Sequence, residues 1–124
     1  MLVFVYGTLK RGYWNHDLLS TAPFVGEAIS VDDFRMGNVG SFPEIKLAEI
    51  GDQAGRVTGE IYDVDERTLQ SLDRLEANGR MYEREELEFE VNGDVVIAWT
   101  YLWMGQPTDA IEPVDGQLTW SCVS

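Results

Sequence analysis

The chain has 124 residues, of which 44% are hydrophobic and 25% are charged, the balance of an ordinary globular protein. This length suits one domain over residues 1–124, and the apolar content excludes disorder as the default. The net charge of −13 argues against nucleic acid and acidic membrane surfaces as partners, because both are bound through clustered lysines and arginines.

Two further features predict a cytoplasmic protein. No apolar run is long enough to span a membrane, and the N-terminal residues lack the basic region of a secretory signal. The only cysteine is Cys122, so no internal disulfide can form, which suits a reducing compartment.

The first half of the chain predicts short strands joined by loops. Leu2 to Tyr6 is a run of β-formers typical of a buried strand, and a loop with a glycine at each end follows over 7–12. Asn15 is placed to cap a short helix that ends near Ser20. Further strands are predicted, with a loop over 37–43, at 24–31, 34–36, 45–48 and 57–64.

The clearest helix signal follows these strands. Asp65 is placed to cap a helix with Glu66 in its first turn. The pattern continues to Ala77 and predicts a left-handed stop near Asn78 and Gly79.

A hairpin is predicted after the helix. Strands over 82–91 and 95–103 flank Asn92 and Gly93, which suit a two-residue turn. In that register Arg84 opposes Tyr101, and one face carries Tyr82, Arg84, Tyr101 and Trp103. The second strand is apolar on both faces, which predicts a central position in the sheet. Residues 105–124 show no period and are predicted to form an irregular tail packed on the body.

The helix presents one carboxylate on its apolar side. A helix turns about 100° per residue, so Glu76 points about 340° from Leu69, between the directions of Leu69 and Leu72. Desolvation there would raise the pKa of Glu76 towards a value suited to general acid–base catalysis. The alternative is that Glu76 turns to water or pairs with Arg80 or Arg84.

The loop after the first strand is a second candidate site. Gly7 allows backbone N–H groups to converge on an anion or a carbonyl oxygen. Gly7 and Gly12 have the spacing of a phosphate loop, but Tyr13 and Trp14 replace the lysine and hydroxyl residue that should follow. A nucleotide site is therefore not expected, and the glycines alone are more typical of a tight turn.

Other side chains indicate no further chemistry. His16 has no partners for a catalytic triad and is expected to be solvated or to cap a helix. No His/Cys cluster is present for zinc. Asp63, Asp65 and Glu66 lack the glycine and spacing of a calcium loop, so no metal site is predicted.

In combination, these motifs resemble the gamma-glutamylcyclotransferase-like superfamily and, within it, the gamma-glutamylamine cyclotransferases. The resemblance rests on FVYGTLKRG from Phe4 to Gly12 and on GEIYDVDERTLQSLDRLE from Gly59 to Glu76. The spaced pair Tyr82-x-Arg84 supports it further. Weaker matches are Asn15, Leu19, Phe42-Pro43 and Tyr101.

The resemblance implies an α+β fold: a small mixed β-barrel flanked by short helices. It implies a pocket between the loop after the first strand and the end of the helix. By position, the resemblance implies that Glu76 is the catalytic residue. The positions implied for substrate binding are Tyr6, Gly7, Thr8, Leu9, Tyr82 and Tyr101.

The implied reaction converts a gamma-glutamyl amine or isopeptide into 5-oxoproline and a free amine, without a metal or organic cofactor. Two alternatives stay open. The leaving group could belong to a gamma-glutamyl amino acid, a glutathione-like compound or a biosynthetic intermediate. The same scaffold could also bind a small ligand without turnover. The implied partner is a small molecule, and the sequence does not distinguish a monomer from a weak dimer.

Overall fold

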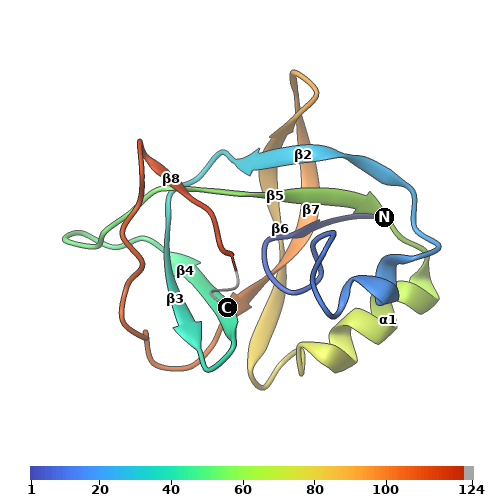
Figure 1. The fold of residues 1–124 in the computed structure, drawn as a ribbon, viewed down its shortest axis with the longest axis horizontal. Helices are drawn as coiled ribbons and strands as arrows, with labels where there is room; N and C mark the ends of the chain where they lie inside the picture. The colour runs from blue at the N-terminus through green and yellow to red at the C-terminus, as the bar shows by residue number, and fades with distance from the viewer. Residues whose placement is uncertain (122–124) are drawn as a thin grey trace.

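A computed structural model describes residues 1–121 and shows a barrel of five strands (Figure 1). Its strands are β1 (Leu2–Val5), β2 (Phe24–Ser30), β5 (Arg56–Asp63), β6 (Tyr82–Val91) and β7 (Asp94–Trp103). They follow the order β1-β7-β6-β2-β5, and β1 pairs with β5 to close the ring. Because β1 is antiparallel to β5 and parallel to β7, the barrel is mixed. The predicted fold class is confirmed.

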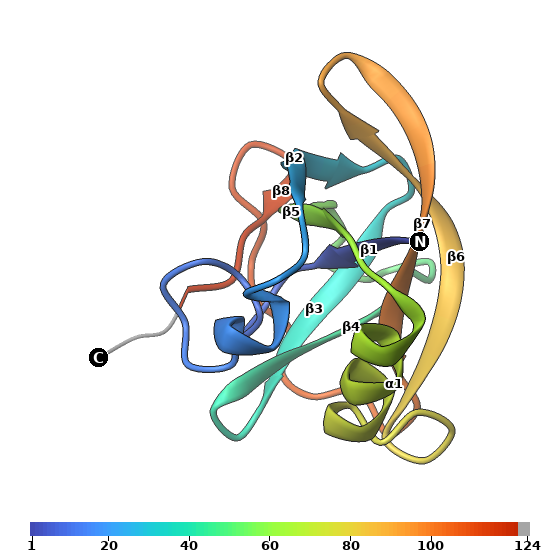
Figure 2. The same ribbon diagram turned by 90° about the vertical axis from the view of Figure 1, so that its right-hand side faces the viewer.

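The remaining elements surround this barrel. They are the 3₁₀ helix η1 (His16–Leu19), β3 (Phe34–Val39), β4 (Phe42–Leu47), α1 (Glu66–Leu75) and β8 (Gln117–Leu118). The β3–β4 hairpin forms a separate two-stranded sheet, and β8 pairs in parallel with β5. The helices η1 and α1 lie on the same side of the barrel (Figure 1, Figure 2). No helix within residues 1–121 combines the length and hydropathy needed to cross a membrane.

Strand β1 separates two hydrophobic clusters. Phe4 faces the barrel interior, where its ring stacks on Phe89 with centroids 4.1 Å apart. Val3 and Val5 face the opposite way and pack in a second cluster with Leu72 of α1. Both faces of the strand are therefore buried, as its run of β-formers predicts.

The start of α1 follows the predicted cap. The Asp65 carboxylate accepts a hydrogen bond from the Thr68 backbone N–H at 2.7 Å. Leu69 and Leu72 are buried beneath the helix. The predicted short helix is present as η1, with Asn15 at its N-cap position and Ser20 at its C-cap. The predicted side-chain cap is wrong, because the Asn15 side chain makes no capping hydrogen bond.

The loop predicted over 37–43 is wrong as well. Val39 pairs with Phe42, so β3 and β4 are joined by a two-residue turn in which Gly40 has φ 65°. Gly37 lies within β3, paired with Glu44, and this position requires glycine because a Cβ there would collide with Thr108 of the C-terminal segment. These glycines serve a turn and a close approach, although their sequence pattern favours a loop.

The β6–β7 hairpin has the predicted register. Val91 pairs with Asp94 and Arg84 pairs with Tyr101. Strand β7 lies between β6 and β1, but β1 pairs with it only at Trp99, in the second half of β7. The predicted central position therefore holds only for that half. The first half projects beyond the barrel (Figure 1), which leaves the side chain of Ile97 61% exposed.

The C-terminal segment runs over the body of the protein. Leu118 and Trp120 are buried in the barrel cluster. The Lys10 ammonium donates a hydrogen bond to the Trp120 carbonyl at 2.6 Å. Cys122, which the sequence predicts to lack an internal partner, lies outside the described residues.

Candidate active site

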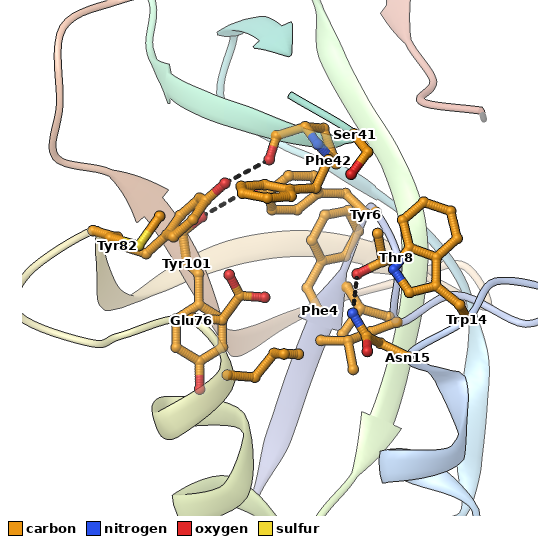
Figure 3. A pocket seen from close by; sticks show the side chains of 16 residues that line it. Phe4, Tyr6, Thr8, Trp14, Asn15, Ser41, Phe42, Glu76, Tyr82 and Tyr101 are labelled. Carbon is orange, nitrogen blue, oxygen red and sulfur yellow. Dashed lines mark hydrogen bonds between the residues drawn. The ribbon is translucent and has the colours of Figure 1, made fainter. Parts of the chain in front are cut away.

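One cavity of about 310 Å³ opens between the end of β1, the tip of the β3–β4 hairpin and the end of α1 (Figure 3). This volume is in the range of small-molecule sites. The cavity is lined by every residue predicted for the site: Tyr6, Gly7, Thr8, Leu9, Glu76, Tyr82 and Tyr101. The structure therefore brings together side chains from both halves of the sequence.

Glu76 supplies the carboxylate of this cavity. Its side chain is half-buried, and within residues 1–121 no hydrogen bond or ion pair reaches its carboxylate. Burial raises its pKa to about 7, because removing a carboxylate from water disfavours the charged form. Neither Arg80 nor Arg84 pairs with it, and Arg84 instead binds Asp73.

The position of Glu76 follows from how α1 ends. The last helical residue is Leu75, and Glu76 is the C-cap with φ −84° and ψ −1°. Ala77 takes the left-handed conformation with φ 48°, a position that usually holds glycine. The predicted helix end is therefore too late, and the left-handed stop at Gly79 follows the cap rather than forming it.

Two backbone hydrogen bonds close this helix end. The N–H of Ala77 donates to the Arg74 carbonyl at 3.2 Å, and the N–H of Asn78 donates to the Asp73 carbonyl at 2.9 Å. This pair of bonds is the Schellman arrangement, which turns the chain sharply away from the helix axis. The turn directs Glu76 into the cavity (Figure 3).

Three tyrosines surround the carboxylate, and each hydroxyl already donates to the protein. Tyr6 donates to the Tyr101 carbonyl and Tyr82 to the Pro43 carbonyl, both at 2.7 Å. Tyr101 donates to Asp73 at 2.7 Å. The tyrosines therefore contribute ring surface and fixed geometry, since their hydroxyl protons are committed to these acceptors.

The same tyrosines stay uncharged. Burial raises the pKa of all three hydroxyls, and the nearby Glu76 carboxylate raises them further. A tyrosinate beside a carboxylate would place two like charges in a desolvated space. The three rings thus form a neutral wall around Glu76.

The loop over 7–9 forms the opposite wall. Within residues 1–121, the backbone N–H groups of Gly7, Thr8 and Leu9 have no hydrogen-bond acceptor. A Cβ on Gly7 would lie 2.6 Å from the Pro43 ring, so only glycine allows this approach. The free donors make this wall suited to an anion or a polarised carbonyl oxygen.

Asn15 and His16 hold this loop from behind. The Asn15 amide donates to the Thr8 hydroxyl at 2.9 Å. His16 Nδ1 lies 2.9 Å from the Leu9 carbonyl, and this nitrogen must carry the proton because a carbonyl can only accept. The expected solvated or capping role of His16 is therefore wrong. The only feature of the sequence that could have predicted the contact of His16 with Leu9 is that His16 follows the loop closely along the chain.

The more exposed part of the cavity lining is mostly apolar, with Ser41 as a polar residue there. Trp14, Phe42, Leu75 and Met81 line it there, and the Trp14 side chain is 53% exposed. Among the described lining residues, Glu76 is the only one with a charged side chain. The part of the chain that the structure describes holds no group of three His, Cys, Asp or Glu side chains suited to a metal.

Comparisons with known proteins place these features in a family context. Residues 3–121 match the family model described as gamma-glutamyl cyclotransferase, AIG2-like. The gamma-glutamylaminecyclotransferase of Bos taurus is 38% identical over 96 residues, which cover 73% of this chain and 57% of the bovine protein. The gamma-glutamylcyclotransferase family protein YtfP of Escherichia coli strain K12 is 30% identical over 115 residues, or 93% of this chain and 92% of that protein.

A solved structure shows the same fold. The crystal structure of an AIG2-like protein from Mus musculus superposes with a TM-score of 0.73 at 36% identity, covering 83% of this chain and 76% of the mouse chain. The chain thus spans a little over half of the bovine relative's length and most of the bacterial one.

Proposed function

Because the chain belongs to the gamma-glutamyl cyclotransferase, AIG2-like family, we propose that it converts gamma-glutamyl amines or isopeptides into 5-oxoproline and a free amine. In this reaction the α-amino group of the substrate attacks its own γ-carbonyl carbon. A five-membered ring closes and the bond to the leaving nitrogen breaks.

One observation carries the proposal. A desolvated carboxylate, Glu76, faces a loop of unpaired backbone N–H groups across a single small cavity. An intramolecular attack needs no nucleophile from the protein, only a base and a pocket that holds the substrate folded back on itself. The cavity supplies these parts, and of the two aliphatic hydroxyl residues in the described lining, Thr8 and Ser41, neither forms a hydrogen bond with Glu76.

Glu76 is assigned the proton transfers. At neutral pH an α-amino group carries an extra proton, which must leave before the nitrogen can attack. The Glu76 carboxylate takes this proton and delivers it to the leaving nitrogen, so that the amine departs neutral. The second proton of the attacking nitrogen passes to the freed carboxylate and from there to solvent, which leaves a neutral ring amide. Its pKa of about 7 suits both roles, because a group near the working pH both accepts and donates protons efficiently.

The loop over 7–9 is assigned the charge stabilisation. As the nitrogen attacks, the γ-carbonyl oxygen becomes an oxyanion, and fixed backbone donors in a dry pocket stabilise such a charge. The same N–H groups are suited to the substrate carboxylate. The rings of Tyr6, Tyr82 and Tyr101 exclude water and restrict the glutamyl chain to a folded shape.

The lining favours an amine over an amino acid as the leaving group. A leaving amino acid carries a second carboxylate, and the described lining offers it no lysine, arginine or histidine. That carboxylate would also approach Glu76, which has the same charge. A simple amine avoids both penalties. In an ε-linked lysine the carboxylate is attached to the fifth carbon from the leaving nitrogen instead of the first, so it lies further from Glu76 and both penalties are smaller.

The proposal is tested by incubating the protein with gamma-glutamyl-ε-lysine and analysing the products by mass spectrometry. We expect 5-oxoproline and free lysine in equal amounts. A parallel series with gamma-glutamyl amino acids and glutathione tests the leaving group, and the expected rates are lower there.

Two results would overturn the proposal. Formation of glutamate instead of 5-oxoproline would mean that water, and not the α-amino group, attacks the carbonyl. Ligand-induced thermal stabilisation without any product from the whole series would mean that the cavity binds gamma-glutamyl compounds without converting them.

A further inference from the structure

The proposed reaction leaves one set of residues beside the cavity without a role. Asp73 lies three residues before Glu76 on α1, and one of its carboxylate oxygens accepts two hydrogen bonds. Arg84 Nε of β6 donates to it at 2.9 Å, and the Tyr101 hydroxyl of β7 donates to it at 2.7 Å. Asp73 thereby ties the last turn of α1 to two strands of the barrel.

Arg84 is itself fixed on three sides. Its guanidinium lies over the Trp99 ring, 4.2 Å from the ring centroid. Its backbone N–H donates to the Asn78 side chain at 2.9 Å, and Asn78 follows the helix cap. The residues before and after Glu76 are therefore both held by the same strand.

Asp73 and Glu76 belong to one helix end but have opposite environments. Asp73 has the arginine, and Glu76 has no cation within the described chain. A free Arg84 guanidinium near the cavity would lower the pKa of Glu76 by favouring its charged form. The ion pair with Asp73 holds the Arg84 guanidinium away from Glu76 and compensates its charge.

We infer that Asp73, Arg84 and Tyr101 are positioning residues, which hold Glu76 inside the cavity and keep the arginine away from it. This inference rests on the proposed function of Glu76. The three residues act on the reaction only through Glu76, and Asp73 and Arg84 do not line the cavity. Tyr101 contributes its ring to the cavity and its hydroxyl to Asp73.

The other groups around Glu76 do not supply a cation. The titratable side chains that face it from neighbouring elements are Tyr6, Tyr82 and Tyr101. Glu44 of β4 faces Tyr6 and Tyr82 from behind. Release of the helix end would therefore expose Glu76 to water or to the freed arginine, and both changes lower its pKa.

The test is the variant Asp73→Asn, assayed for 5-oxoproline formation across about pH 5 to pH 9. We expect kcat to fall about 10- to 100-fold with little change in KM, since the carboxylate is displaced rather than the substrate site. The acid limb of kcat/KM moves from about 7 towards the ordinary glutamate value of about 4.3. A role in stability alone would leave this limb in place.

Two variants sharpen the test. Tyr101→Phe keeps the ring and removes only the hydroxyl, so it is expected to shift the limb in the same direction by a smaller amount. The double variant is expected to be no worse than Asp73→Asn alone, because both changes break one network. Glu90→Gln is the matched control, since it breaks the exposed Arg56–Glu90 pair of 3.0 Å on the same sheet.

The inference is overturned if Asp73→Asn lowers only the melting temperature and keeps the wild-type acid limb and kcat. If the wild-type protein forms no 5-oxoproline, the proposed function fails. The positioning role is then tested by the pH dependence of the unfolding free energy. In that case the fall in unfolding free energy between about pH 5 and pH 8, which the burial of Glu76 causes, should disappear in Asp73→Asn. An unchanged fall would contradict it.

Discussion

The β3–β4 hairpin and the end of α1 each place a glutamate near the same two tyrosines, Tyr6 and Tyr82. In the hairpin, Glu44 is fully buried and its carboxylate accepts from Arg35 at 2.7 Å. Burial raises the pKa of Glu44, and Arg35 opposes that rise. At the helix end, Glu76 is less buried, no cation among residues 1–121 pairs with it, and its pKa rises to about 7.

This difference distinguishes a carboxylate that has a structural partner from the carboxylate to which we assign the proton transfers. Arg35 also donates to the Thr108 carbonyl, so the Arg35–Glu44 pair fastens the hairpin to the C-terminal segment and thereby supports the wall formed by Phe42 and Pro43. The Glu76 carboxylate forms no hydrogen bond or ion pair with another residue in 1–121. It opens onto the cavity with a pKa near neutrality, which is the property expected of a group that exchanges protons with a substrate.

Replacing Glu76 should separate the two regions most clearly. Glu76→Gln keeps the size of the side chain and removes its proton-transfer capacity, so 5-oxoproline formation is expected to fall about 10²- to 10⁴-fold. The melting temperature should stay at the wild-type value or rise, because a desolvated charge is removed. Turnover at the wild-type rate would exclude Glu76 from the chemistry.

Replacing Glu44 should have the opposite outcome. Glu44→Gln leaves the Arg35 guanidinium buried without its counter-charge, a change that typically costs about 3–5 kcal/mol of stability. Urea denaturation measures this loss, with Glu76→Gln as the matched variant. A Glu44→Gln protein as stable as wild type would mean that the pair does not support the hairpin.

The pH dependence of stability should reveal the unpaired carboxylate. The pKa of Glu76 is about 7 in the folded protein and about 4.3 in the unfolded chain. The folded state therefore binds the proton more tightly, and this stabilisation is full below the unfolded pKa and lost as pH rises through the folded one. We expect unfolding free energy to fall by up to about 4 kcal/mol across this window. Denaturation of Glu76→Gln should lack this part of the fall.

The smallest expected effect concerns the residue that turns the chain after Glu76. Ala77 is left-handed with φ 48°, a conformation that is unfavourable for residues with a Cβ. Ala77→Gly should therefore stabilise the protein by about 0.5–1 kcal/mol, measured by urea denaturation. A loss of stability would show that the helix end relies on the alanine methyl group.

The parts of the site that local patterns encode could be predicted from the sequence. The helical period places Glu76 beside Leu69 and Leu72, and the Asn92–Gly93 turn fixes Arg84 opposite Tyr101. Both predictions depend on spacing within one element or one hairpin, where geometry follows directly from residue number.

The remaining parts depend on contacts between distant segments. In the sequence, Gly37 and Gly40 suggest a loop. The structure shows that Gly37 makes room for Thr108 and that Gly40 forms a tight turn. Asp73 lies about 40° from Leu69 around the helix, at the edge of its apolar side, and only the docking of α1 on β6 and β7 gives it partners. His16 likewise gains its role from a loop that folds back over it.

The most direct test of the central claim is a carbon-13 NMR titration of the side-chain carboxyl of Glu76, assigned by comparison with Glu76→Gln. The account predicts a titration midpoint of about 7 for this carboxyl. A midpoint near the ordinary value of about 4.3 would show that Glu76 is solvated or paired with a cation. That result would contradict its proposed role as the acid and base of the cyclisation.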